Sequence, residues 1–535
     1  MFLSYFLTTA ALSIGALGAQ VTHDWTISEI PVNLDGKHPR TAIGVNGQMT
    51  VPVVRAQLGD TLVLRVHNKL DEPTGLHSHG IFNNGTNYYD GAGGITECGV
   101  APKSTFDYRI PLVQTGTYWL HGHHGSQYMN GLRGPLIITD PNGEPYDYDE
   151  DIVVAMEDFF PQTSHMTMAG EPDMHKMNST GTGMGMGMAD RQTNEFPLRD
   201  KIKAPEDKYP IPLINGQSTL KHQNLRFTPG RTYRIRLLNI GSTMMFRFGI
   251  EGHDLHIIEV DGLATKPRNV SSVEVAVAQR VSVLVTAKPQ ASHNYRYHIE
   301  QFSDIFPEVS GFNPNHQEGL VLYDRNAPTR RCRDITWEHF EDMKLTPLDM
   351  LPLMTPDVRH DVTLTANRVD NEIIGMFINN ISFALPAVPS MFTALAARGQ
   401  MTTKTFPRNS NVHVLGHLHV LELRIFNHDI VRHPMHMHGH FFQIVEQGVI
   451  GKPETVVRSG RYPMRRDTAV VPPGHYMTMR FRADNPGVWM FHCHIDKHAA
   501  SGLTMLFACA PEVMNERIRV PNSVVDHCRM MGIDV

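Results

Sequence analysis

The feature that most constrains the fold is a strand pattern that occurs three times along the 535-residue chain. In each copy, a turn containing glycine leads into a strand-like run rich in alternating apolar residues that ends in asparagine. The copies are GDTLVLRVHN (59–68), PGRTYRIRLLN (229–239) and GHLHVLELRIFN (416–427). A period of two is typical of strands that bury one face. A repeated unit of this kind predicts tandem β-sandwich domains.

The length supports the same interpretation, because at about 150 residues per domain the chain holds three domains. Few segments show helical periodicity, and short runs rich in Val, Ile, Thr and aromatic residues are separated by Gly, Pro, Asn and Asp. We therefore predict an all-β protein of three Greek-key β-sandwiches covering 20–148, 149–328 and 329–535. The second would contain a methionine-rich, low-complexity insertion at 163–208.

Composition narrows the class of protein. With 41% hydrophobic residues, 19% charged residues and a net charge of -6, the chain is typical of soluble globular proteins. It carries no large single-sign charge, so no nucleic-acid partner is expected. Residues 1–19 resemble a secretory signal peptide cut near Gly18 or Ala19, the alternative being an uncleaved anchor. No later stretch is long and apolar enough to span a membrane. We expect a secreted, unanchored monomer, extracellular or in the cell wall, with N-glycosylation sequons at Asn84, Asn178, Asn269 and Asn380.

The five cysteines are an odd set. Cys493 lies between two histidines, which suggests a role other than a disulfide. The other four can form up to two disulfides in an oxidising compartment, and the sequence leaves three pairings open. These are Cys98, Cys332, Cys509 and Cys528.

Histidine is abundant, with 31 copies, and it is the commonest metal ligand in proteins. One His-x-His pair is a weak signal, since such pairs are more often ordinary surface or core residues. Four short motifs in one chain are a much stronger one. They are HSHG (77–80), HGHHG (121–125), HPMHMHG (433–439) and HCHIDKH (492–498).

The spacing in the last motif has a geometric meaning. Side chains alternate across a strand, so His492 and His494 point one way and Cys493 points the other. A thiolate with two imidazoles is the ligand set of a blue-copper centre, and His433 and His498 can supply the imidazoles. The remaining eight are too many for one tetrahedral zinc ion. They are His77, His79, His121, His123, His436, His438, His492 and His494.

These motifs make the chain resemble the multicopper oxidases, especially the secreted fungal laccases and ferroxidase-like members. Other family-like passages are YYDGAGGITEC (88–98), GTYWLHGHHG (116–125), YPMRRDT (462–468) and NPGVWMFHCHIDKH (485–498). The resemblance implies cupredoxin-like domains and four copper ions, with three of the ions between domains 1 and 3. It assigns His433, Cys493 and His498 to the type 1 copper, and His77 and His436 to the type 2 copper. The type 3 pair takes His79, His121, His123, His438, His492 and His494.

The resemblance also implies four-electron reduction of O2 to water, which needs protons. Asp90 and Asp496 match positions where the family places carboxylates near the cluster, and we predict that they relay protons. Alternatively, Asp90 only caps a turn and Asp496 only supports an imidazole. Leu503 takes the axial position of the type 1 copper, where a residue that cannot ligate keeps the potential high. Met505 is its rival for that position, and Lys497 replaces the usual aromatic residue.

The sequence constrains the identity of the electron donor less than it constrains the copper ligands. We favour a laccase-like enzyme that oxidises phenols or naphthols, as in pigment or polyketide coupling, although no acid lies between Gly216 and Gly230 to take the phenolic proton. The alternative is a ferroxidase, with Glu206 and Glu308 as iron carboxylates, but a third acid expected near Gly399 is missing. A cuprous oxidase for copper tolerance is a further alternative. It rests on thioethers of the insertion, at Met166, Met168, Met174, Met177, Met184, Met186 and Met188, with His165 and His175.

Overall fold

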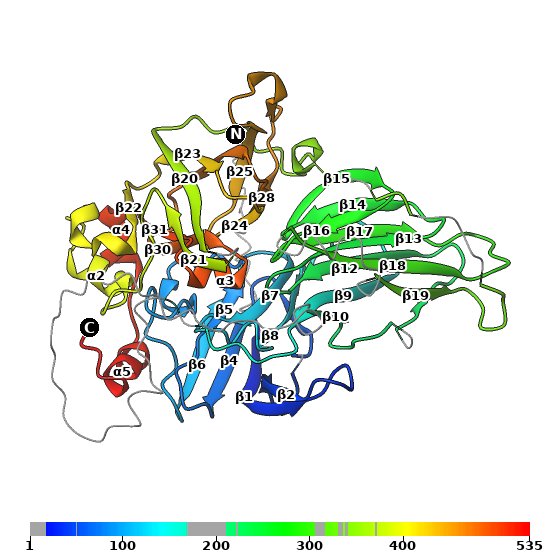
Figure 1. Ribbon diagram of the computed structural model, residues 1–535, viewed down its shortest axis with the longest axis horizontal. Helices are drawn as coiled ribbons and strands as arrows, with labels where there is room; N and C mark the ends of the chain where they lie inside the picture. The colour runs from blue at the N-terminus through cyan, green and yellow to red at the C-terminus, as the bar shows by residue number, and fades with distance from the viewer. Residues whose placement is uncertain are drawn as a thin grey trace, which may run out of the picture.

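The protein is described by a computed structural model that covers residues 18–49, 51–166, 168, 210–220, 223–304, 316–329, 335–337, 341–369 and 372–535. Six sheets pair into three sandwiches, coloured blue to cyan, green, and yellow to red along the chain (Figure 1). The predicted all-β, cupredoxin-like fold is confirmed. The predicted domain boundaries near 148 and 328 fall between strands and stay predictions.

Domain 1 packs two four-stranded sheets against each other. One has the order β2 (Arg40–Val45), β1 (Gln20–Val32), β4 (Thr61–Asn68), β6 (Thr105–Pro111). The other has the order β3 (Val54–Gln57), β8 (Arg133–Thr139), β7 (Gly116–Gly122), β5 (Leu76–His79).

Domain 2 pairs a six-stranded with a five-stranded sheet. The first runs β10 (Ile211–Ile214), β9 (Glu150–Phe159), β12 (Thr232–Asn239), β17 (Arg280–Thr286), β14 (Leu255–Val260), β15 (Leu263–Val270). The second runs β11 (Leu225–Arg226), β19 (His316–Leu322), β18 (Tyr295–Phe302), β13 (Met245–Ile250), β16 (Val273–Val275).

Domain 3 pairs a seven-stranded with a five-stranded sheet and carries the described α-helices. The first sheet runs β21 (Glu372–Ile378), β20 (Val358–Val369), β23 (Val420–Asn427), β29 (His475–Arg482), β25 (Phe442–Val449), β26 (Val457–Arg458), with β27 (Arg465–Arg466) also on β25. The second runs β22 (Val412–Leu415), β31 (Thr504–Cys509), β30 (Gly487–Cys493), β24 (His433–Met437), β28 (Thr468–Val471). The helices are α2 (Ser390–Ala396), α3 (Asp496–Ala500), α4 (Pro511–Arg517) and α5 (Asn522–Met530).

The repeated sequence motif has the same structural role in each domain. Its strand, β4, β12 or β23, pairs in parallel with the first strand of its own domain. The terminal asparagine, Asn68, Asn239 or Asn427, is buried and binds the turn that follows. Its Nδ2 donates to main-chain carbonyl groups 2.8–3.2 Å away, and its Oδ1 accepts from the amide two residues later at 2.9 Å. Because the buried amide satisfies groups that water cannot reach, asparagine recurs at this position.

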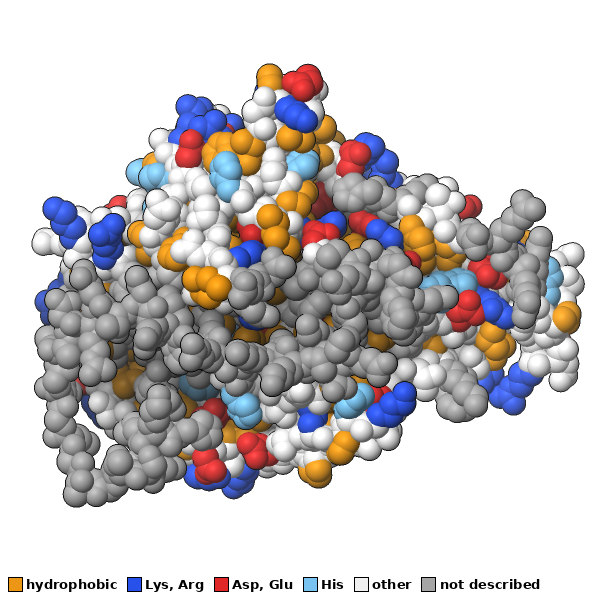
Figure 2. Space-filling view, in the orientation of Figure 1, with side chains coloured by type: hydrophobic (Ala, Val, Ile, Leu, Met, Phe, Trp, Pro, Cys, Tyr) orange, Lys and Arg blue, Asp and Glu red, His pale blue; other side chains and the backbone are white. Residues whose placement is uncertain are grey.

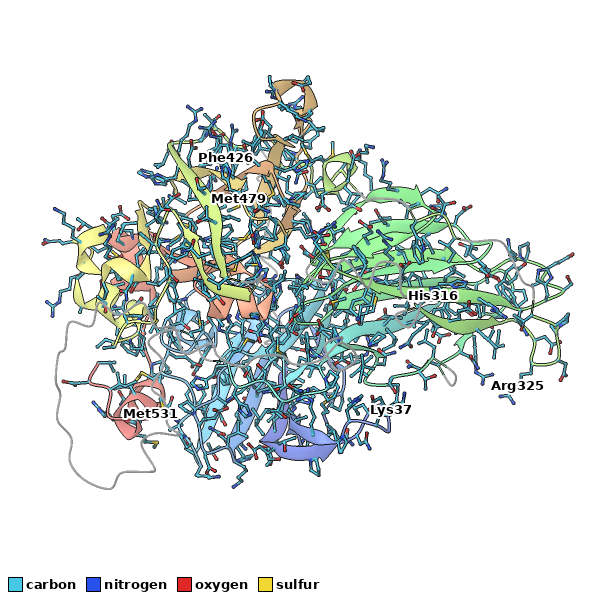
Figure 3. All side chains as sticks on the ribbon, viewed as in Figure 1. Lys37, His316, Arg325, Phe426, Met479 and Met531 are labelled. Carbon is cyan, nitrogen blue, oxygen red and sulfur yellow. A yellow bond between two sulfur atoms is a disulfide. The ribbon has the colours of Figure 1, made fainter. Side chains whose placement is uncertain are left out.

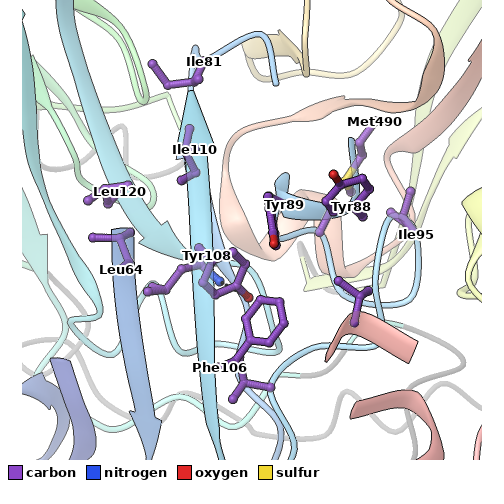
Figure 4. Packing of buried hydrophobic residues seen from close by; sticks show 14 of the residues in the cluster. Leu64, Ile81, Tyr88, Tyr89, Ile95, Phe106, Tyr108, Ile110, Leu120 and Met490 are labelled. Atoms are coloured by element: carbon purple, nitrogen blue, oxygen red, sulfur yellow. Dashed lines mark hydrogen bonds between the residues drawn. The ribbon is translucent and has the colours of Figure 1, made fainter. Parts of the chain in front are cut away.

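Domains 1 and 3 share one apolar core. Met490 of β30 packs in the same cluster as Tyr88 and Ile95 of domain 1 (Figure 4). The Asn87 side chain exchanges two hydrogen bonds, each 3.1 Å long, with the main chain of Val488. This docking brings β5 and β7 of domain 1 next to β24 and β30 of domain 3.

The cysteines only partly follow the expectation. Cys98 forms a disulfide with Cys528 of α5, which ties domain 1 to the end of the chain. Cys509 is a buried free thiol in β31, so a second disulfide through Cys509 is not present. Cys332 lies outside the described residues.

The predicted signal peptide and the predicted N-glycosylation sites concern residues that are exposed or that lie outside the described part of the chain. Residues 1–17 lie outside the described part of the chain, as does Asn178. Asn84, Asn269 and Asn380 have exposed side chains. Within the described ranges, no helix has the length and apolar character needed to cross a bilayer.

Candidate metal centre

Side chains alternate between the two faces of strands β24 and β30, and this alternation divides their ligands between two clusters. In register, Met435 lies opposite Cys493 and His436 opposite His492. The faces of these strands therefore separate His436 and His492 from Cys493, as the sequence predicts. On domain 1, β5 and β7 place His77 directly opposite His121.

The smaller cluster, called here the type 1 cluster, consists of His433, Cys493 and His498. The Cys493 Sγ lies 3.5 Å from Nδ1 of each histidine, and the two Nδ1 atoms are 3.2 Å apart. All three side chains are buried. Burial raises the pKa of the Cys493 thiol and lowers the pKa of His433, so the site favours neutral groups unless a cation is present.

The larger cluster, called here the eight-histidine cluster, holds the other predicted ligands. Within it, ligand nitrogens of His77, His436 and His438 lie within 4.8 Å of one another, and so do those of His77, His79 and His121 and of His123, His438 and His492. His494 joins through its Nε2, which is 3.2 Å from His79 Nδ1. The structure thus brings together all eight histidines that the sequence singled out.

The ring nitrogens fit bound cations. Nδ1 of His77, His121 and His436 donates to main-chain carbonyl groups at 2.7–2.9 Å, while Nε2 of each is buried without a hydrogen-bond partner. Nε2 of His438 and Nε2 of His492 face each other at 3.2 Å, although both rings donate from Nδ1 to oxygen. Opposed lone pairs at that distance are explained by metal ions between the rings.

Burial keeps these imidazoles neutral. It lowers the pKa of His123 to about 3 and the pKa of His79, His121, His492 and His494 well below the ordinary value, with neighbouring histidines adding to the effect. A neutral imidazole is the form that binds metals.

Two buried carboxylates support the eight-histidine cluster, each beside a different pair of histidines. Asp90, predicted from the sequence, accepts from His438 Nδ1 at 2.8 Å and lies 3.3 Å from His77 Nδ1. Asp467 was missed, although it lies in the quoted YPMRRDT passage. Its Oδ1 is 3.2 Å from His79 Nε2 and its main-chain carbonyl accepts from His436.

Arg280 of domain 2 holds Asp467 in place with two hydrogen bonds of 2.9 and 2.6 Å, and both side chains are buried. Burial acts to raise the pKa of Asp467, but the Arg280 charge and the bonds from His436 and Arg280 hold it well below its usual value. Gly80, in HSHG, has φ +87°, and a Cβ there would lie 2.7 Å from both Arg280 Nη2 and Asp467 Oδ2. The three domains therefore meet beside His79.

The remaining predicted residues surround the clusters. Asp496, at the start of α3, lines a cavity of about 40 Å³ together with His121, His123, His492 and His494. That volume exceeds the ~10–15 Å³ that one water needs. Leu503 is buried in the same apolar cluster as Cys493 and Met505. Its axial role stays a prediction.

One acid near the type 1 cluster was also missed. Asp429 Oδ2 lies 3.3 Å from His433 Nε2, and Arg368 Nη2 binds both Asp429 oxygens at 2.9 and 2.8 Å. Its signal was its position four residues before His433, on the turn ordered by Asn427. Gly399, where the third iron acid was expected, instead packs against α4 near Pro511. Glu206 and Glu308 lie outside the described residues. So does the insertion apart from 163–166 and Met168.

Three family models, each described as multicopper oxidase, match residues 26–143, 146–314 and 382–513. The chain belongs to the multicopper oxidase family. As a member it uses four copper ions, one of type 1, one of type 2 and a type 3 pair, in a copper-dependent oxidation with O2 as the acceptor.

Among curated relatives, this multicopper oxidase is 35% identical to the iron multicopper oxidase fer1 of Mycosarcoma maydis, over 98% of this chain and 86% of that protein. It is 33% identical to the iron transport multicopper oxidase fio1 of Schizosaccharomyces pombe, over 95% and 79%. Among solved structures, Fet3p, a multicopper oxidase that functions in iron import, superposes with a TM-score of 0.82 at 27% identity, covering 96% of both chains. A laccase from Botrytis aclada has a TM-score of 0.77 at 26% identity, covering 96% and 92%.

These relatives contradict the preference for phenol oxidation and for a part in pigment or polyketide coupling. Several of the relatives most similar in sequence are named as iron oxidases rather than laccases. The physical reason for the error is that the copper motifs serve both branches. The acid expected near Gly399 is absent there, and the acid that contacts His433 is Asp429.

Proposed function

We propose that the protein is a ferroxidase. Four Fe²⁺ ions, one O2 and four protons give four Fe³⁺ ions and two waters. The observation that carries the proposal is the Asp429 carboxylate in contact with His433, and the names of the iron oxidase relatives support it.

Asp429 suits an iron donor because carboxylate oxygen and imidazole are both ligand types that suit iron ions. Burial acts to raise its pKa, but bonds from His433 and Arg368 hold the pKa below its usual range, so the group is an anion at neutral pH. Asp304, which is 26% exposed, pairs with Arg432, the residue before His433. Two carboxylates thus lie close enough to act electrostatically on His433, Asp429 buried and Asp304 partly exposed.

The proposed copper ligands are those the sequence predicted. His433, Cys493 and His498 would hold the type 1 ion, and His77 and His436 the type 2 ion. The type 3 ions would take His79, His121, His123, His438, His492 and His494. When bound, copper would supply one-electron acceptance at the type 1 site and four-electron reduction of O2 at the three-ion site. Cys493 is consecutive with His492 and His494, so one short peptide segment joins the two clusters.

Proton supply is the proposed task of Asp90 and Asp496. Asp90 is buried between His77 and His438, so it can hold a proton beside them and release it inward. Asp496 lines the cavity next to the histidines and lies nearer the surface. We also propose that the protein works outside the cytosol, which the Cys98–Cys528 disulfide and three exposed sequons support.

The test is side-by-side turnover of Fe²⁺ and 2,6-dimethoxyphenol by purified, copper-loaded protein. We expect kcat/KM for Fe²⁺ to exceed that for the phenol about a hundredfold. Asp429→Asn should lower kcat/KM for Fe²⁺ about 10–100-fold, the usual range for losing a group that supports a metal ligand. Asp361→Asn is a control, because Asp361 forms an exposed ion pair with Arg424 on the same domain. A preference for the phenol in the wild-type protein would refute the proposal.

A further inference from the structure

A second group of metal-ligand side chains lies in domain 2, apart from the copper clusters. Strands β18 and β19 are antiparallel, with His298 opposite Glu318 and Glu300 opposite His316. Directly opposed residues share a face of the sheet, and residues two apart on one strand do too. Two histidines and two glutamates therefore alternate on one small area of the sheet.

Three of these side chains converge on a common point. His298 Nδ1 lies 3.0 Å from His316 Nε2 and 3.8 Å from Glu318 Oε1, and His316 Nε2 lies 3.6 Å from the same oxygen. A tetrahedral ion bound at about 2.0–2.2 Å spaces its ligands roughly 3.3–3.5 Å apart. The observed triangle brackets that spacing, so small side-chain shifts suffice to hold an ion.

Glu251 fixes the orientation of the central histidine. It is 6% exposed, follows β13, and its Oε1 lies 3.1 Å from His298 Nε2. A carboxylate accepts, so Nε2 carries the proton and the Nδ1 lone pair points at His316 and Glu318. A buried carboxylate behind a histidine is the usual support of a metal-binding imidazole. The other Glu251 oxygen is buried and has no hydrogen-bond partner within the described residues.

The electrostatics and access also favour a cation. Arg296 pairs with Glu318 Oε2, which leaves Oε1 toward the histidines, and Glu251 and Glu300 add negative charge. His316 is 30% and Glu318 42% exposed, so an ion can enter from solvent. His316 lies on the outer part of domain 2 (Figure 3), and Figure 2 shows histidine and acidic side chains side by side at the corresponding place.

We propose that His298, His316 and Glu318, supported by Glu251, form a surface site for one divalent transition-metal ion. Two imidazoles and one carboxylate are a known zinc ligand set, and Cu²⁺ binds the same donors still more tightly. The site shares no residue with the copper clusters, so it stands whether or not the ferroxidase proposal does.

The test is calorimetric titration of the copper-loaded protein with Zn²⁺, with the copper content measured before and after. We expect one Zn²⁺ bound per chain while four copper ions are retained. His316→Ala and Glu318→Gln should each weaken zinc binding at least tenfold, and Glu251→Gln about 10–100-fold. His293→Gln, in the same domain but outside the group, should bind zinc as the wild type does.

Two results would overturn the site. If the wild-type protein binds no Zn²⁺ at this stoichiometry, His298 and His316 are only a hydrogen-bonded pair. If His316→Ala and Glu318→Gln both bind zinc with wild-type affinity, the ion lies elsewhere. Ferroxidase turnover of all these variants should match the wild type, which separates this test from that of the proposed function.

Discussion

The two copper clusters differ in how many domains build them. His433, Cys493 and His498 all come from domain 3, within strands and a helix of one sandwich. The eight-histidine cluster takes four ligands from each of domains 1 and 3, and Arg280 of domain 2 holds its supporting acid Asp467. Folding of one domain is therefore enough to form the type 1 cluster, whereas the larger cluster needs the docking of all three.

The largest effect should come from removing the residue that joins the clusters. Cys493→Ser replaces the soft thiolate ligand with a hydroxyl, so we expect loss of the blue absorption and of all ferroxidase turnover. Absorption spectra and Fe²⁺ oxidation rates measure this. Cys509→Ser is the matched control, because Cys509 is the other buried free thiol among the described residues. If Cys493→Ser retained Fe²⁺ oxidation, the thiol would not lie on the electron-transfer path.

The second prediction tests the docking directly by comparing two arginines. Arg280→Met leaves Asp467 buried without its partner, which costs about 3–5 kcal/mol, and we expect copper to be lost from the eight-histidine cluster while the blue absorption remains. Arg368→Met removes the partner of Asp429, but Arg368 is 19% exposed, so a smaller loss of stability is expected and four copper ions should stay bound. Copper content and thermal melting measure both. Equal copper loss in the two variants would contradict the domain-docking argument.

The sequence predicted those features of the two copper clusters that depend on the spacing of nearby residues. Alternation in His492-Cys493-His494 separates two sites on one strand, and the repeated strand ending in Asn68, Asn239 and Asn427 predicts three sandwiches. Both follow from a period of two, which local sequence records. The assignment of all ten histidines to the two clusters came instead from the resemblance to the multicopper oxidases.

Two supporting acids, Asp467 and Asp429, could not be predicted because the arginines that hold them are distant in the chain. Asp467 becomes important through Arg280, which is 187 residues away in the chain. Asp429 depends on Arg368 and on a turn that Asn427 orders. The donor was assigned wrongly because the position of Asp429 four residues before His433 does not by itself show that the carboxylate contacts the histidine; that contact forms on folding.

The third prediction separates the clusters by kinetics. Asp90→Asn keeps the hydrogen-bonding shape beside His438 but cannot carry the proton, so reoxidation of the reduced enzyme by O2 should slow about a hundredfold. Reduction of the blue copper by Fe²⁺ should stay at the wild-type rate, because Asp90 is not part of the type 1 cluster. Asp496→Asn should show the same pattern more weakly. Stopped-flow traces measure both steps, and wild-type reoxidation would show that Asp90 is only structural.

The last prediction, with no expected effect on turnover, concerns a buried acid of domain 1 that interacts electrostatically with Asp90. Glu97 is 2% exposed, accepts from Tyr108 Oη at 2.7 Å, and burial raises its pKa to about 8. At the type 1 cluster, the nearby acid Asp429 has its pKa shifted in the opposite direction. Between the ordinary carboxyl pKa of about 4.3 and 8, folded Glu97 keeps a proton that the unfolded chain has released.

Stability therefore falls as pH rises through that window, by up to about 1.4 kcal/mol per pH unit, and levels off above it. Glu97→Gln keeps an oxygen that accepts from Tyr108 and has no such titration. Between pH 5 and pH 8, the Tm of this variant should rise steadily relative to the Tm of the wild type. Its ferroxidase turnover should not change. Glu29→Gln, at an exposed position on β1, should follow the wild-type curve. If the Tm values of Glu97→Gln and the wild type changed in parallel with pH, Glu97 would be ionised in the folded protein. Glu97 of domain 1 and Asp429 of domain 3 would then both be ionised in the folded protein.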